Sequence, residues 1–231
     1  MLRLIRADLL KLERRRGMLA VVAGLIFAAV GVYFLVGAIL DKPTDFDSAA
    51  GILVLLASVA GAIIGATVGG ADIETGVFRD LVATGRSRSA LFFARVPAAW
   101  AIVLGLLAAA LVVAAVIARP GVGQFGEAAA QVLVSGALSA AVCVGLAAMT
   151  GRSGPVMGLA LAFQLGVAPL LAQIEALGDA RLAIPAVAIS RFGGADGFVG
   201  ALPLLGAIAI ILAWAAAGLA GGLYRTRTQE I

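Results

Sequence analysis

Three residue types are scarce or missing in this chain, and each shortage removes a class of site. Histidine is absent, cysteine occurs once, as Cys143, and lysine occurs twice, as Lys11 and Lys42. One cysteine forms no disulfide within the chain, and without histidine or a second cysteine no metal site is expected. Neither lysine stands in the G-x-x-x-x-G-K-[ST] pattern that cradles phosphates. We therefore expect no catalytic residue and no ATP hydrolysis by this chain.

Charge is missing from six long apolar segments. They make up most of the chain, whose hydrophobic content is 62% and whose mean hydropathy is +1.10. A bilayer core about 30 Å thick needs roughly 20 apolar residues in helical form. The sequence therefore predicts an all-α polytopic membrane protein, a single transmembrane domain over residues 1–231. The predicted spans are Met18–Leu40, Ala49–Ala71, Val96–Ala118, Val132–Met149, Pro155–Ala172 and Val199–Leu223.

The predicted spans also lack the acidic or basic residue on which ion coupling usually depends. A charge at the centre of a membrane costs about 2.5 to 3.5 kcal/mol on insertion scales and is kept chiefly for function. Since an ion- or proton-coupled secondary transporter would be expected to keep such a charge, this class is the less favoured alternative for the function of the chain. An apolar pathway suits an apolar or amphipathic cargo, such as a drug, a lipid or a peptide.

Basic residues alternate between the loops and thereby predict the topology, because lysine and arginine near short loops stay on the cytoplasmic side. Thirteen of the seventeen lie at the two ends and in the second and fourth loops: Arg3, Arg6, Lys11, Arg14, Arg15, Arg16, Arg79, Arg86, Arg88, Arg95, Arg152, Arg225 and Arg227. The other four are Lys42, Arg119, Arg181 and Arg191. We expect a bacterial inner-membrane protein with both termini cytoplasmic. The basic balance then reflects orientation in the lipid bilayer, and nucleic acid is not an expected partner.

The first 16 residues predict an amphipathic helix on the inner membrane surface. Leu2, Ile5, Leu9 and Leu12 recur at spacings of three and four, and the basic residues lie mostly on the other faces. Such a helix lays its leucines into the acyl boundary while its arginines meet anionic headgroups. It either anchors the chain or, as an elbow before the first span, also contacts a cytoplasmic partner.

Residues 72–95 form the most patterned loop of the chain. From Gly76 onward a short helix is predicted whose apolar face holds Val77, Phe78, Leu81 and Val82, opposite Arg79 and Asp80. Thr84 and Gly85 would end it, and Ser87 would cap the next helix. An exposed apolar ridge on the cytoplasmic side either lies in the membrane interface or inserts into a groove of another protein.

This loop resembles the first cytoplasmic loop of type-2 permeases of ATP-binding-cassette (ABC) exporters, in which the coupling helix lies. The resemblance is carried by Asp72, Glu74, Gly76, Leu81, Arg86, Ser87, Arg88 and Arg95. Val77 and Arg86 stand where the family often has threonine and proline. The number of spans, the amphipathic N-terminal helix and the long fifth loop are similar too. The ATPase-coupling residues that the resemblance implies are Asp72, Glu74, Gly76, Phe78, Arg79, Leu81, Ser87 and Arg88.

A permease of this family binds no cofactor itself. The resemblance implies a separate cassette ATPase that binds ATP and Mg, and a second permease copy, identical or a sister subunit. Closure of the ATPase would then switch the permease between inward and outward access, exporting the cargo. A second function stays open from the sequence, in which the same fold serves a non-transporting immunity or sensor subunit.

The spans contain small residues and few polar ones. Gly61, Gly65 and Gly69 repeat at four-residue spacing, which favours close helix packing within the chain, with a place at a dimer interface or facing the cavity as the alternative. Gln164 is the most polar residue deep in a span, and we predict that it contacts substrate, with Thr67 and Ser58 as further candidates. An interhelical hydrogen bond is the alternative role for Gln164.

The fifth loop, residues 173–200, is expected on the external side. Its apolar piece, Leu182–Ile189, is interrupted by Pro185 and is too short to span a bilayer. It is therefore predicted to be a re-entrant or interfacial segment that covers the exit of the pathway, or a surface loop that shields the ends of the spans.

Overall fold

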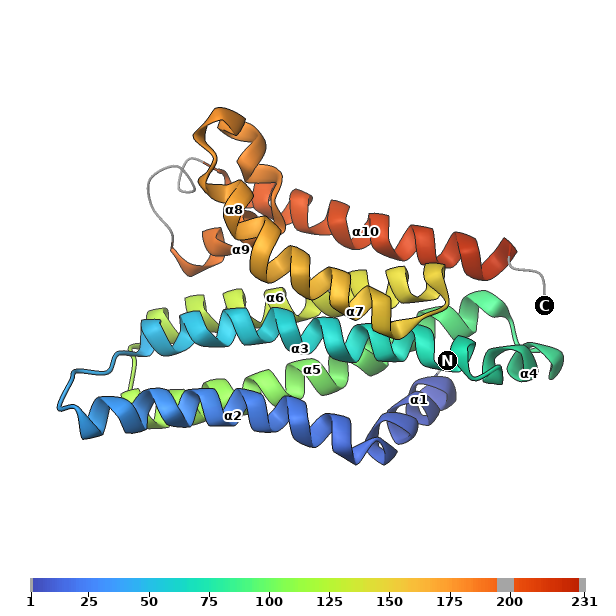
Figure 1. The fold of residues 1–231 in the computed structure, drawn as a ribbon, viewed down its shortest axis with the longest axis horizontal. Coiled ribbons are helices and arrows are strands. Elements are labelled where there is room, and N and C mark those ends of the chain that lie inside the picture. The colour runs from blue at the N-terminus through green and yellow to red at the C-terminus, as the bar shows by residue number, and fades with distance from the viewer. Residues whose placement is uncertain (1, 195–201, 229–231) are drawn as a thin grey trace.

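The fold is a bundle of long helices, seen in a computed structural model that describes residues 2–194 and 202–228 (Figure 1). Within these residues all regular structure is helical. The α-helices are α1 Leu2–Arg14, α2 Arg16–Ile39, α3 Phe46–Glu74, α4 Val77–Ala83, α5 Arg88–Ala118, α6 Val122–Thr150, α7 Ser153–Ala162, α8 Ala168–Gln173, α9 Pro185–Ser190 and α10 Leu204–Thr228. A π-helical turn, Phe163–Val167, joins α7 to α8, and 3₁₀ turns cover Glu175–Ala183 and Arg191–Gly193.

Six helical segments are long and apolar enough to cross a membrane: α2, α3, α5, α6, the continuous segment Ser153–Gln173 and α10. This confirms the predicted multi-pass architecture. Several helices run further than their apolar cores; α5, for example, begins at Arg88, where the sequence predicted a span from Val96. The reason is local, because Ser87 Oγ accepts a 3.3 Å hydrogen bond from the Ala90 N–H and so caps the helix. The predicted start of the last span, Val199, lies outside the described residues.

Helices α3 and α6 form the middle of the bundle. In each, 67% of the most apolar window is buried, against 17% in α2 and 11% in α10. Helices α2 and α5 lie on one side of this pair, and α7 and α10 on the other (Figure 1). The outer helices therefore present their apolar side chains to the surroundings, as helices that face lipid do.

Close packing of α3 on α6 depends on the glycines of α3. A Cβ on Gly61 would lie 2.6 Å from the Gly136 carbonyl oxygen, and a Cβ on Gly65 or Gly69 would collide with the backbone of Ala140 or Val144. Only hydrogen fits at these positions, so the two backbones approach within contact distance. All of these contacts lie within one chain.

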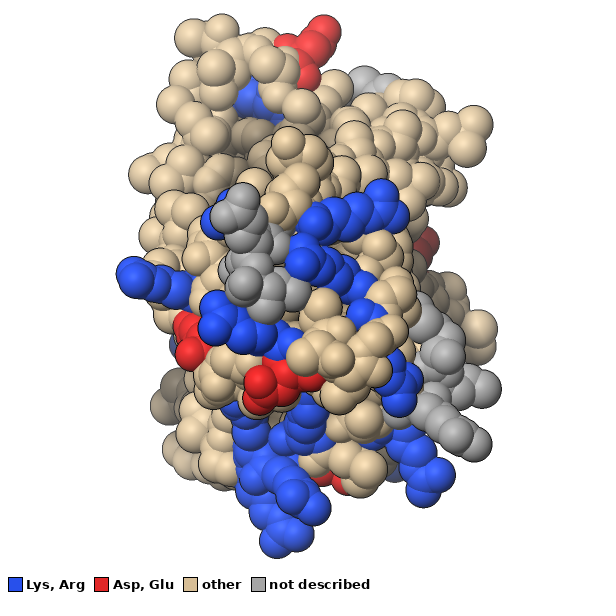
Figure 2. All heavy atoms as spheres, turned by 90° about the vertical axis from the view of Figure 1, so that its right-hand side faces the viewer, with Lys and Arg blue, Asp and Glu red and all other residues tan. Residues whose placement is uncertain are grey.

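One end of the bundle carries α1, α4 and the end of α10 (Figure 1). Figure 2 views this end and shows many lysine and arginine side chains with few acidic ones. Helix α1 ends at Arg14, and the chain turns at Arg15 before α2 begins. The described part of the fifth loop lies toward the opposite end, where Pro185 begins α9 and Ala188 and Ile189 are buried.

Candidate functional site

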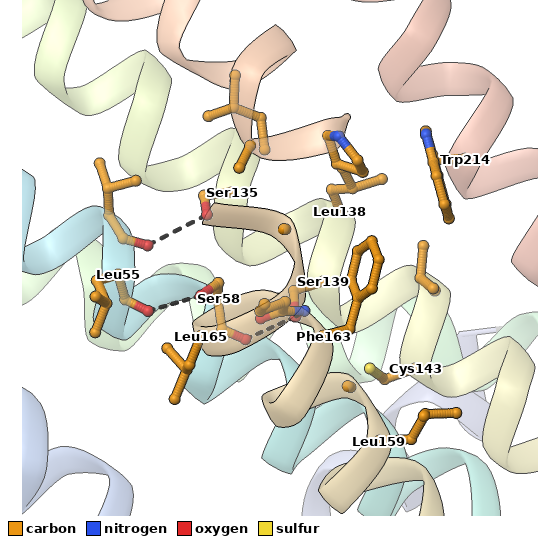
Figure 3. A pocket seen from close by; sticks show the side chains of 18 of the residues that line it. Leu55, Ser58, Ser135, Leu138, Ser139, Cys143, Leu159, Phe163, Leu165 and Trp214 are labelled. Atoms are coloured by element: carbon orange, nitrogen blue, oxygen red, sulfur yellow. Dashed lines mark hydrogen bonds between the residues drawn. The ribbon is translucent and has the colours of Figure 1, made fainter. Parts of the chain in front are cut away.

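A cavity of about 440 Å³ opens between α3, α6, the segment from α7 to α8, and α9 (Figure 3). Its wall is mainly apolar, with leucines from α3, α6 and the segment from α7 to α8, and an aromatic pair, Phe163 and Trp214, whose ring centroids lie 6.1 Å apart. The Trp214 indole N–H donates a 2.9 Å hydrogen bond to the Ala183 carbonyl, which ties α10 to the fifth loop beside the cavity. The volume is in the range of small-molecule pockets.

Gln164 lies on the π-helical turn at this cavity. Its Nε2 donates a 3.0 Å hydrogen bond to Ser139 Oγ on α6, whereas its Oε1 is buried with no hydrogen-bond partner. A π-turn widens one turn of the helix and so changes the direction of the side chains, and such turns often occur at functional sites. The sequence singled out Gln164, but it carries no signal for the π-turn.

Three serine hydroxyls near Gln164 are occupied by backbone carbonyls of α3. Ser58 Oγ donates to Leu55 O at 2.7 Å, Ser139 Oγ to Ser58 O at 2.7 Å and Ser135 Oγ to Val54 O at 3.3 Å (Figure 3). Of the three pathway candidates, Gln164 and Ser58 line the cavity. Thr67 does not, since it donates to Ile63 O within α3 and lies on the side of α1.

A charged cluster occupies the basic end of the bundle. Lys11 of α1 contacts Asp72 of α3 at 2.9 Å and Asp8 at 3.5 Å. Arg95 of α5, only 2% exposed, lies 3.7 Å from the Asp72 carboxylate, and its Nη1 donates a 3.0 Å hydrogen bond to the Gly69 carbonyl. These contacts join α1, α3 and α5, so the cluster fixes the amphipathic helix to two spans.

Arg95 also joins the loop helix α4 to this cluster, because its guanidinium carbon lies 5.2 Å from the centre of the Phe78 ring. Phe78 is 5% exposed, and Leu81 and Val82 are half-buried. The expectation of an exposed apolar ridge on this helix was therefore wrong. The apolar face turns onto the chain itself, and Arg79 and Asp80 form the outward face.

Glu74 is exposed but is held by hydrogen bonds to another segment of the chain. It accepts hydrogen bonds from the Ser153 N–H at 2.6 Å and from the Ser153 hydroxyl at 2.9 and 3.0 Å. A carboxylate at the start of α7 stabilises the unpaired N–H groups of that helix end. Glu74 therefore connects the end of α3 to the beginning of α7.

The remaining loop residues have clear local roles. Gly76 adopts the left-handed conformation, with φ of 76°, that lets the chain turn from α3 into α4. Ser87 caps α5, as the sequence predicted. Arg88 donates a 3.0 Å hydrogen bond from Nη1 to the Arg227 carbonyl, which holds the end of α10 beside the start of α5.

Burial changes the electrostatics of the cluster at α1. Desolvation raises the pKa of the Asp8 carboxyl, and the neighbouring Lys11 ammonium partly opposes this effect. Among the described residues, no group of histidine, cysteine, aspartate or glutamate side chains is placed to hold a metal ion.

The sequence analysis placed Arg95 at the end of the loop 72–95, whereas it lies within α5 and is buried. The signal was its position in an apolar helical context, with Phe92 and Val96 near it and an acidic residue at the end of the preceding span.

Comparison with protein-family models, curated proteins and solved structures gave no match. Fold and side-chain geometry are therefore the basis for the function that we propose.

Proposed function

We propose that this chain is the transmembrane permease subunit of an ATP-driven ABC exporter, with ATP hydrolysed by a separate cassette subunit. The observation that carries the proposal is the contact set of Arg95, which joins the loop helix α4 to α3 and α5. A partner that moves α4 would move the ends of two spans with it. Coupling helices need such a rigid connection.

The same contacts lead toward the cavity. Helix α3 bears Gly69 and Asp72 at the charged cluster and Ser58 at the cavity wall. Helices transmit displacement as rigid bodies, and small shifts between packed helices are a common form of switching. In this proposal, displacement of α4 tilts α3 against α7 and changes access to the cavity, with a second permease copy completing the pathway.

The surface offered to the ATPase is polar. Arg79 and Asp80 on the outer face of α4 are exposed, and many basic side chains lie on this end of the molecule (Figure 2). The docking residues of the proposal are therefore Arg79 and Asp80, whereas Phe78 and Glu74 act by holding the loop to the bundle.

Two other functions remain as competing proposals. An ion- or proton-coupled transporter is less well supported, because the residues lining the cavity carry no charge and no residue of the charged cluster lines it. A non-transporting immunity or sensor subunit would use the same docking surface. Unlike an exporter, such a subunit would not let any cargo stimulate the activity of the ATPase.

The test is affinity purification of the tagged chain from its native membrane in mild detergent, followed by mass spectrometry. We expect a stoichiometric cassette ATPase, lost in the double variant Arg79→Ala, Asp80→Ala and retained in Lys42→Ala, an exposed cation in the loop between α2 and α3. A folded, membrane-inserted chain without any ATPase would overturn the proposal. Cargo stimulation of ATPase activity in vesicles then separates the exporter from the sensor.

A further inference from the structure

The cavity contains one unused hydrogen-bonding atom. Among the described residues, Gln164 Oε1 is the sole buried side-chain nitrogen or oxygen atom without a partner. Leaving a buried polar atom unpaired is unfavourable, so native structures rarely keep one without a reason. Here the atom belongs to a residue on a π-turn that lines a cavity of about 440 Å³.

The donors around this atom are already committed. The hydroxyls of Ser58, Ser135 and Ser139 donate to backbone carbonyls, and the Trp214 indole N–H donates to Ala183 O. The Gln164 amide nitrogen donates to Ser139. Among these side chains, the Gln164 amide oxygen is the buried acceptor that has no hydrogen bond at all, and the serine hydroxyls and the indole have no proton left to donate to it.

The rest of the wall restricts the ligand further. No lining residue is charged, and most are leucine, valine, alanine or aromatic. A charged ligand would lose its hydration without gaining a counter-ion, which is strongly unfavourable in such surroundings. A neutral apolar body loses nothing of that kind and gains from leaving water.

We propose that the cavity binds a neutral, largely apolar molecule that carries a hydrogen-bond donor, a hydroxyl or an amide N–H, which it donates to Gln164 Oε1. Calling this molecule the cargo depends on the proposed export function, but its binding does not. Gln164 is then a specificity residue: Nε2 stays bonded to Ser139, and the side chain shifts so that the covered, unpaired Oε1 meets the donor of the ligand. The inference excludes anionic and cationic amphiphiles as preferred ligands.

The two tryptophans make binding measurable. Trp214 lines the cavity, whereas Trp100 lies on α5, outside the cavity wall, so Trp100→Phe leaves one reporter at the site. The probes are 11-bromoundecan-1-ol, its methyl ether and 11-bromoundecanoate, because bromine quenches indole fluorescence. The purified chain is studied in nanodiscs without nucleotide or ATPase.

We expect saturable quenching by the alcohol, with an affinity about three- to tenfold higher than that of the ether, the range of one hydrogen bond. The carboxylate should bind more weakly than either. Gln164→Leu should abolish the preference for the alcohol while ether binding remains, because the apolar wall is intact. Gln173→Leu, the same change at an exposed glutamine of α8, should leave the preference unchanged.

Equal affinities for alcohol and ether, or a preference that survives in Gln164→Leu, would overturn the inference. So would quenching that rises linearly with probe in the lipid and never saturates. If Gln164→Leu does not fold, Gln164→Met, which is unbranched like glutamine, provides the same comparison. A chain that captures an ATPase but fails this binding test would keep the proposed function and lose the ligand class. A chain that passes the binding test but captures no ATPase would keep the ligand class and lose the proposed function.

Discussion

The guanidinium of Arg95 lies over the ring of Phe78, 5.2 Å from its centre, and thereby joins the fifth helix to the short loop helix. Arg95 is 2% exposed and also bonds the Gly69 carbonyl. An arginine is kept at such a buried position only with several partners, since an isolated buried charge is unstable. Four helices therefore meet at one side chain and its neighbour Asp72.

Asp72 and Lys11 should differ in their effect on stability. Asp72→Asn removes the carboxylate that faces the buried Arg95, so we expect the free energy of unfolding to fall by about 1 to 3 kcal/mol. Lys11→Ala removes an ammonium whose side chain is 44% exposed, and the expected loss is below about 1 kcal/mol. Thermal unfolding in detergent measures both. Equal losses of stability would contradict a dominant contribution from the contact between Asp72 and the buried Arg95. Asp80→Asn, which changes an exposed carboxylate, is the control.

Close packing of α3 on α6 predicts a position-specific effect of alanine. Gly65→Ala places a methyl group against the Ala140 backbone and should lower stability by about 1 to 3 kcal/mol. Gly105→Ala in α5 has open space around the new methyl group and should be neutral or slightly stabilising. Measuring both melting temperatures checks this, and an unaffected Gly65→Ala protein would show that the helices can separate freely.

Glu74 and Arg79 should produce different defects. Glu74→Ala leaves the Ser153 N–H at the start of α7 without its acceptor, and a lost cap of this kind costs about 0.5 to 2 kcal/mol. Arg79→Ala changes an exposed side chain and should leave stability within about 0.5 kcal/mol while ATPase binding is lost. A double-mutant cycle of Glu74→Ala with Ser153→Ala measures the part of the contact that the Ser153 hydroxyl makes, because the alanine keeps the backbone N–H. Simple additivity in that cycle would mean that the carboxylate and the hydroxyl are not coupled.

The raised pKa of Asp8 predicts a pH dependence with a defined sign. The folded chain holds the Asp8 proton more tightly than the unfolded chain, whose carboxyl titrates near the ordinary value of 3.8. Stability contributed by this group therefore falls as the pH rises from about that value through the raised folded pKa, and stays lower above it.

Asp8→Asn removes this ionisation and should make the chain at least as stable as the wild type at pH 7, with the advantage shrinking toward pH 4. The difference between the two unfolding curves isolates Asp8 from other carboxyls, such as Asp45, whose pKa is lowered by hydrogen bonds from Ser48. A variant that is less stable at pH 7 would indicate that attraction to Lys11 outweighs desolvation.

The spans and the loop helix were predictable because they depend on local pattern. Twenty apolar residues without charge specify a membrane helix wherever they occur, and Gly76 and Ser87 mark a start and a cap through their own backbone preferences. The observed helical segments contain the predicted spans Ala49–Ala71, Val96–Ala118, Val132–Met149 and Pro155–Ala172 entirely, whereas α2 ends one residue before Leu40 and α10 begins only at Leu204, after the described Leu202 and Pro203.

The orientation of side chains at the basic end was not predictable, because it depends on contacts between distant segments. The pattern of α4 predicted an exposed Phe78, whereas Arg95 of the following helix covers its ring. Glu74 likewise meets Ser153 from a segment far along the chain. The π-turn at Gln164 has no sequence signature, so the free acceptor in the cavity emerged only from the packing of α7 on α6.

The central claim is that α4 contacts a cassette ATPase, and site-specific crosslinking tests it most directly. A photoreactive amino acid replaces Asp80 on the outer face of α4 or, as a control, Lys42. Lys42 belongs to the loop between α2 and α3, which lies at the other end of the bundle from α4 (Figure 1), and native membranes are illuminated. We predict a crosslink to a nucleotide-hydrolysing protein from position 80 and none from position 42. Absence of such a product from position 80, in a chain that is folded and inserted, would contradict the claim.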